Sequence, residues 1–94
     1  MGIRQPSPYL RQLVTDFLRA CCEKGDRTHA VAKDTLYAAF LEWADLTGKA
    51  NPPAMTVFSR VLLARGDVWA GRVRDPDTGN RVPHFFGTRL GWWM

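Results

Sequence analysis

The residues that most often perform chemistry in proteins are scarce in this chain, which has two cysteines and two histidines among its 94 residues. Cys21 and Cys22 are adjacent and cannot clip distant segments together, and Cys21 falls on an apolar helical stripe, where a thiol is usually an inert small hydrophobe. His29 and His84 stand at no spacing from the cysteines that is typical of a zinc site. We therefore expect a binding protein and not an enzyme, without catalytic residues, metal or cofactor.

The run Asp75–Asn80 is a second candidate, because its alternating aspartates are similar to the start of a calcium-binding loop. However, the glycine is displaced from the sixth place of such a loop, and the twelfth place holds Phe86 where the loop needs glutamate. The run is therefore better explained as a turn.

Cations are the third candidate, because the formal net charge of +4 is unevenly distributed. Residues 1–48 hold six Lys or Arg and six Asp or Glu, whereas residues 49–94 hold seven and three. A neutral half and a basic half indicate a scaffold that carries an anion-binding surface. Chance asymmetry on a solvated surface is the alternative.

Three segments with helical periodicity would have to position these cations. Residues 8–23 carry one apolar stripe and begin at Ser7-Pro8, a typical helix start. Residues 34–47 place a broad, partly aromatic face on one side. A third helix is expected after Asn51-Pro52-Pro53, in which Asn51 is the cap residue and the two prolines pre-set the first turn, and it should stop at Gly66.

The pattern then changes from helical to extended. Residues 68–74 and 81–86 are rich in β-branched and aromatic residues and flank the turn formers of residues 75–80, which predicts a β-hairpin. Pro83 cannot donate to a ladder, so the second arm should be an edge over at least part of its length. A short extended segment, Ala30-Val31-Ala32, precedes the second helix.

The order helix, short extension, helix, helix, hairpin predicts an α+β fold of the winged helix-turn-helix type, with three helices and a C-terminal β-hairpin wing. We expect one domain over residues 1–94, with a core over about residues 7–90 and a tail over residues 91–94. Two adjacent rings in the tail, Trp92 and Trp93, cannot both point inward from an extended segment. One of them is a candidate for weak self-association.

Four runs follow one another at compact spacing: Phe17–Cys22, Leu36–Trp43, Phe58–Leu62 with Arg65-Gly66, and Gly87–Leu90. The most specific part is Leu-Tyr-x-x-Phe-x-x-Trp followed after a glycine by Phe-small-Arg-x-x-Leu. Together these runs resemble the C-terminal winged-helix domain of phage and plasmid primase-helicases, the family that also includes the poxvirus primase-helicase. The resemblance covers roughly residues 15–90.

This resemblance implies a DNA-binding accessory module that normally follows a helicase ATPase, although this chain holds no G-x-x-x-x-G-K-[ST] motif. The partners it implies are DNA, mainly through its phosphate backbone, and a parent helicase ATPase domain or another replication protein. No apolar run approaches the roughly 20 residues of a membrane span, so we expect no membrane partner. Adjacent cysteines provide no disulfide framework, which favours a reducing cytoplasm, and the resemblance implies that of a bacterial host.

Cations beside a protruding hairpin could bind DNA phosphates, and the exposed side of the third helix could enter a groove of the duplex. The residues expected to contact DNA are Lys49, Thr56, Ser59, Arg60, Arg72, Arg74, Arg81 and His84. Symmetric pairing of the hairpin would set Arg74 opposite Arg81, where either a phosphate or a folded-back Asp75 or Asp77 would have to separate the charges.

The third helix presents few polar groups, so backbone-dominated binding is expected over readout of base sequence. The alternative is a winged helix used for protein interaction, such as a small phage-encoded protein that binds a host replication or defence complex.

Overall fold

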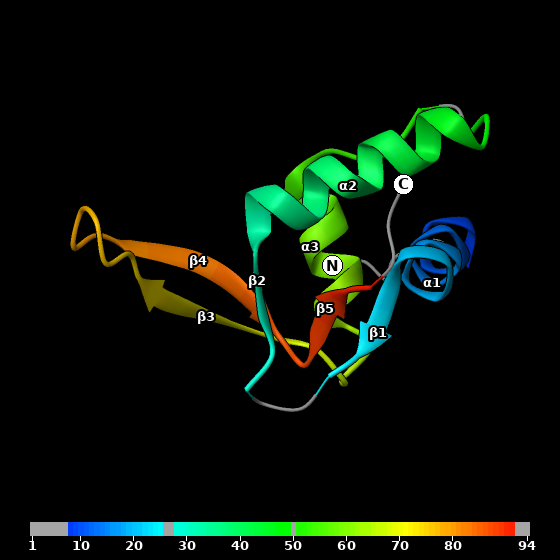
Figure 1. Cartoon of the computed structure of the whole chain (residues 1–94). Coiled ribbons are helices and arrows are strands. Elements are labelled where there is room, and N and C mark those ends of the chain that lie inside the picture. The colour runs from blue at the N-terminus through cyan, green and yellow to red at the C-terminus, as the bar shows by residue number, and fades with distance from the viewer. Residues whose placement is uncertain (1–7, 26–27, 50, 92–94) are drawn as a thin grey trace, which may run out of the picture.

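The chain has an α+β fold. A computed structural model describes residues 8–25, 28–49 and 51–91, and in those ranges it contains three helices and five short strands (Figure 1). In chain order the elements are α1 (Pro8–Cys21), β1 (Cys22–Lys24), β2 (Ala30–Ala32), α2 (Lys33–Leu46), α3 (Met55–Leu63), β3 (Trp69–Arg74), β4 (Arg81–Phe86) and β5 (Thr88–Leu90). The predicted three helices, short extension and hairpin are confirmed. The expected cap Ser7 and the tail residues Trp92 and Trp93 lie outside the described ranges.

α1 begins at Pro8, as the sequence predicts, but ends two residues before the expected end at residue 23. Up to Cys21 the helix buries one apolar stripe against the core. Cys22 then begins β1 and pairs with Leu90 of β5. The prediction is wrong at this end because helical periodicity carries no information about a pairing partner near the far end of the chain.

α2 agrees with its prediction within one residue and ends at Leu46. Gly48, just beyond the C-cap Thr47, has a φ of 74°, the left-handed conformation that follows many helices. α3 begins later than predicted, because its N-cap is Ala54 and the prolines stay outside the helix. The Tyr37 hydroxyl donates a 2.7 Å hydrogen bond to the carbonyl of Pro53. This hydrogen bond links α2 to the segment before α3. If α3 began earlier, the Pro53 carbonyl would instead accept a hydrogen bond within the helix.

The core is an aromatic cluster to which all three helices and β4 contribute. Phe17, Phe40, Phe58 and Phe85 are fully buried. The ring centroids of Phe40 and Phe58 lie 4.6 Å apart, and those of Phe58 and Phe85 lie 6.4 Å apart. Such pairs add to the stability that burial of the rings already supplies. The contact of Phe58 with Phe85 fixes α3 against the base of the hairpin.

β4 is the central strand of a three-stranded antiparallel sheet with the order β2-β4-β3. β3 pairs with the whole of β4, from Trp69 opposite Phe86 to Arg74 opposite Arg81. β2 pairs only with residues 84–86. Residues 81–83 of β4 therefore lack a second neighbouring strand, and Pro83 lies in this part, as predicted.

Gly87 bends the chain so that one continuous segment serves two sheets. Its φ is 91°, its N–H donates to the carbonyl of His29 (3.1 Å), and its carbonyl accepts from the N–H of Gly25 (2.9 Å). A Cβ at this position would lie 2.7 Å from the carbonyl oxygen of Asp67. A side chain would therefore meet both backbone strain and a steric clash here.

No helix in the described part of the chain combines the length and the apolar character that crossing a membrane requires.

Candidate nucleic-acid interface

The β3–β4 hairpin projects away from the three helices (Figure 1) and has two chemically different faces. Residues that pair across antiparallel strands share a face, and side chains alternate between faces along each strand. One face carries Arg72, Arg74 and Arg81, and we call it the basic face. The other carries Trp69, His84 and Phe86, and we call it the aromatic face.

The basic face holds three exposed arginines near the tip of the hairpin. Arg74 pairs directly with Arg81, and Arg72 pairs with Pro83. Among the residues that the structure describes, none of these three arginines forms an ion pair. Directly opposed like charges destabilise a strand pair. Repulsion between Arg74 and Arg81 therefore lowers the stability of this end of the hairpin.

The aspartates of the loop do not separate these charges. An oxygen of the Asp75 carboxylate accepts a 2.9 Å hydrogen bond from the backbone N–H of Asp77, and so the side chain serves the turn itself. The loop is closed by hydrogen bonds from the N–H of Asp75 to the Asn80 carbonyl (2.7 Å) and from the N–H of Gly79 to the Asp75 carbonyl (2.8 Å). The sequence allowed either a phosphate or a folded-back aspartate between Arg74 and Arg81. The described residues show no aspartate in that place.

Lys33 extends the basic face toward the core, and sequence reasoning missed it. Its Nζ lies 5.3 Å from the centroid of the Phe85 ring, a cation–π contact. Phe85 pairs with Ala70 and so lies on the same face as Arg72, two residues further along β3. The sequence held a signal for this position, because Lys33 directly follows the extended segment Ala30–Ala32, which forms β2 and pairs with β4.

α3 lies on the same side of the sheet as the basic face, because Phe58 of α3 packs against Phe85. Thr56 and Arg60 are exposed, as predicted, and Ser59 is half-buried. The structure thus brings the predicted α3 residues and the three hairpin arginines to one side of the sheet.

Two predicted residues lie elsewhere. Lys49 follows the C-terminal end of α2, and its N–H donates to the Ala44 carbonyl (2.8 Å). That end of α2 lies on the opposite side of the molecule from the hairpin tip (Figure 1). His84 lies on the aromatic face, where its Nδ1 donates to the Val82 carbonyl (2.8 Å). Side chains alternate between the two faces of a strand, so His84, three residues after Arg81, lies on the face opposite the arginines.

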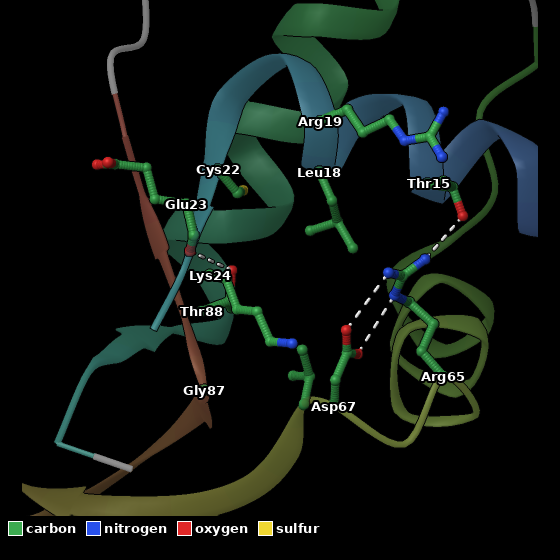
Figure 2. Close-up of a pocket in the computed structure, with 11 residues that line it drawn as sticks. Thr15, Leu18, Arg19, Cys22, Glu23, Lys24, Arg65, Asp67, Gly87 and Thr88 are labelled. Carbon is green, nitrogen blue, oxygen red and sulfur yellow. Dashed lines mark hydrogen bonds and ion pairs between the residues drawn. The ribbon is translucent and has the colours of Figure 1, made fainter. Parts of the chain in front are cut away.

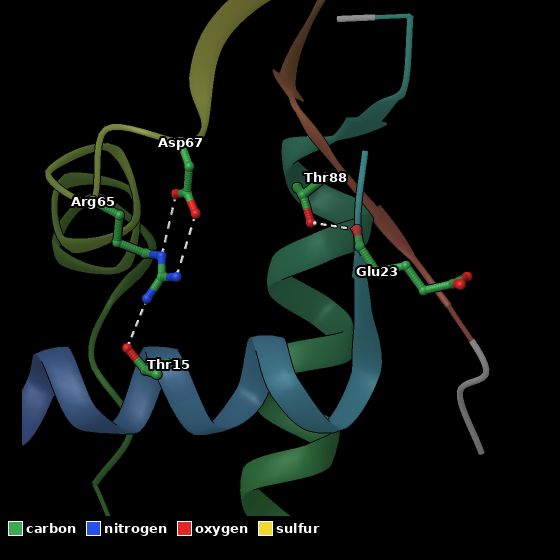
Figure 3. Close-up of polar contacts among 5 residues, drawn as sticks. All are labelled: Thr15, Glu23, Arg65, Asp67 and Thr88. Atoms are coloured by element: carbon green, nitrogen blue, oxygen red, sulfur yellow. Dashed lines mark hydrogen bonds and ion pairs between the residues drawn. The ribbon is translucent and has the colours of Figure 1, made fainter. Parts of the chain in front are cut away.

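A separate pocket of about 230 Å³ lies between α1, β1 and the segment that joins α3 to β3 (Figure 2). Its main polar feature is the Arg65 guanidinium, which pairs with Asp67 (Nε to Oδ1, 3.3 Å) and donates to the Thr15 hydroxyl (2.7 Å) (Figure 3). Nearby, the Thr88 hydroxyl donates to the Glu23 carbonyl (3.4 Å). These groups satisfy one another, which is typical of a structural contact.

The thiol that lines this pocket is a poor nucleophile. Burial raises the pKa of Cys22 to about 12, and the pKa of Cys21 is raised for the same reason. At neutral pH both groups are therefore protonated thiols, and the thiolate is the reactive form. Within the described ranges, no three His, Cys, Asp or Glu side chains are grouped so that they could hold a metal ion.

No family model, no curated protein and no solved structure matches this chain.

Proposed function

We propose that the chain is a winged-helix DNA-binding module, in which α2 and α3 form the helix-turn-helix and the β3–β4 hairpin forms the wing. The topology supports this assignment: the strand that precedes α2 pairs with the second arm of the hairpin, and α3 packs on that same arm through Phe58 and Phe85. The wing and α3 would then approach a duplex from one side.

The observation that carries the proposal is the basic face of the wing. Arg74 and Arg81 lie opposite each other without a carboxylate partner in the described residues, with Arg72 and Lys33 on the same face. A phosphate between opposed arginines turns their mutual repulsion into two attractions, and it accepts hydrogen bonds from both guanidinium groups. DNA supplies phosphates at regular spacing along its backbone.

In this mechanism the wing grips the backbone electrostatically while α3 lies in or across the major groove. Thr56 and Arg60 are the exposed polar side chains that α3 offers, with Ser59 half-buried beside them. Such a helix reads few base edges, so binding depends mainly on the phosphate backbone and weakly on sequence. Lys49 lies too far from this surface to belong to it.

The biological setting that we propose is a phage or plasmid replication protein of the primase-helicase type. Its support is the resemblance of residues 15–90 to the C-terminal domain of that family. In such a protein the module would hold DNA for an attached ATPase domain.

The test is a fluorescence-anisotropy titration of labelled duplex DNA over a series of salt concentrations. The affinity should fall steeply as salt rises. Replacing Arg72, Arg74 and Arg81 together by alanine should reduce the slope of log K against log salt by up to about 2.7, since each phosphate contact contributes about 0.9.

The matched control replaces Arg11, Arg19 and Lys24 by alanine, which removes the same charge from exposed positions on α1 and β1. This variant should keep the wild-type slope. Equal slopes for both triple variants would show that only net charge matters and would overturn the assignment of the wing. Intact DNA binding by the wing variant, together with loss of a protein partner, would favour the protein-interaction alternative.

A further inference from the structure

The aromatic face of the hairpin has no role in binding a duplex backbone, yet it is open to solvent. Trp69 is 45% exposed and Val73 is 37% exposed, and both lie on this face. Phe86 and His84 beside them are half-buried. A row of exposed apolar and aromatic groups on a projecting hairpin is a typical feature of an interaction surface.

Two glycines allow the rings of Phe86 and Trp69 to pack closely against the backbone. A Cβ at Gly71 would lie 2.6 Å from Cε1 of Phe86, and a Cβ at Gly87 would lie 3.0 Å from Cζ3 of Trp69. Each ring therefore occupies the space that a side chain would fill on the neighbouring segment. The arrangement holds the two rings in place on the sheet and leaves part of the Trp69 ring uncovered.

A hollow of about 280 Å³ continues this face toward the tip of the hairpin. Val73, Val82 and His84 line it together with Arg74 and the loop residues 75–76. The hollow thus joins apolar walls to Arg74, for which the described part of the chain shows no ion-pair partner.

These features fit a planar apolar group that is attached to an anion. Nucleobases stack on aromatic side chains whatever their identity, and cations beside the rings hold the phosphates that link them. A second copy of this chain fits less well, because an apolar partner surface would leave the Arg74 guanidinium beside the hollow without an anion. Bases within a duplex are stacked on one another, so only unpaired bases can reach the rings.

We propose that the aromatic face, centred on Trp69 and Phe86, binds the unpaired bases of a DNA single strand. This inference rests on the proposed DNA-binding function and adds a substrate class to it: the basic face holds the backbone, and the aromatic face takes bases where the duplex opens. The chain should therefore prefer a forked duplex to a blunt one.

The experiment compares three labelled DNAs of equal duplex length: a blunt duplex, a fork with two unpaired arms, and the isolated single strand. The wild-type chain should bind the fork more tightly than the blunt duplex. Trp69→Leu keeps apolar bulk without an aromatic ring and should reduce affinity for fork and single strand by about 5- to 150-fold, the range measured for loss of one base stack. Trp69→Phe should retain most of the affinity, and both variants should bind the blunt duplex as the wild type does.

A second measurement needs no variant. A photoreactive 5-iodouracil in the unpaired arm should crosslink to Trp69, His84 or Phe86 of the wild-type chain, as mapped by mass spectrometry. Equal affinity for fork and blunt duplex, or crosslinks confined to α1 or α2, would overturn the inference and leave the proposed duplex binding intact. Sedimentation that shows a dimer lost in Trp69→Leu would also overturn it, in favour of a second copy. Failure to bind the blunt duplex, with fork binding and Trp69 crosslinks present, would instead overturn the backbone mechanism alone.

Discussion

Replacement of Arg81 by glutamine should make the free protein more stable and its complex with DNA weaker. Arg81 lies directly opposite Arg74, and neither has a carboxylate partner in the described residues. Directly opposed residues have Cβ atoms about 5 Å apart. The Arg74 guanidinium extends toward the loop, since its Nη2 lies 3.8 Å from the position of a Cβ on Gly79.

The size of the stability gain follows from Coulomb's law. Two unit charges about 5.5 Å apart in water repel by about 0.8 kcal/mol. Physiological salt roughly halves this at such a distance, which leaves about 0.4 kcal/mol. For a domain of this size the melting temperature should rise by about 2–3 °C. The gain should disappear in 1 M salt, where the Debye length is about 3 Å.

DNA affinity should change in the opposite direction. Loss of one phosphate contact lowers the slope of log K against log salt by about 0.9, which amounts to about eight-fold weaker binding at 0.1 M salt. Thermal unfolding followed by circular dichroism measures the first effect, and anisotropy titration measures the second. Arg11→Gln, which removes the same charge from an exposed position on α1, should change neither. Lower stability of Arg81→Gln at low salt, or unchanged DNA affinity, would refute the reasoning.

Three further changes test other parts of the structure. Arg60→Ala should weaken duplex binding by about 1–3 kcal/mol and leave the melting temperature unchanged, because the side chain is exposed; a lost fold with unaltered affinity would show that the faces of α3 are reversed. Gly87→Ala should lower the free energy of unfolding by about 1–3 kcal/mol in urea titration, because φ is 91° and the Cβ would meet the carbonyl of Asp67; wild-type stability would argue against the bend. Burial raises the pKa of Cys22 from 9.0 to about 12. The unfolded chain therefore loses this proton first, so stability should fall as pH rises from about 9 toward 12, and Cys22→Ala should show a smaller fall.

Several features of the molecule follow from the sequence alone, because their signals are local. The apolar periodicity of α1 and α2 is contained within each segment, and the turn formers of residues 75–80 set both the loop and its register. Once the register is known, the pairing of Arg74 with Arg81 requires no further information. The exposure of Arg60 likewise follows from the helical period.

Other features were decided only by the tertiary structure, because they depend on residues far apart in the chain. The ladder between β1 and β5 ends α1 at Cys21, although the helical pattern continues past that residue. The hydrogen bond from Tyr37 to the Pro53 carbonyl keeps the prolines out of α3.

The same holds for the candidate site. Its composition depends on which face of the hairpin packs against the core, and Phe85 decides this by its contact with Phe58. That contact places the arginines on the side of α3, where Lys33 lies over the Phe85 ring, and leaves Trp69 and His84 on the outer face. Alternation along a strand defines two faces, but only burial of one of them against another element determines what each face can bind.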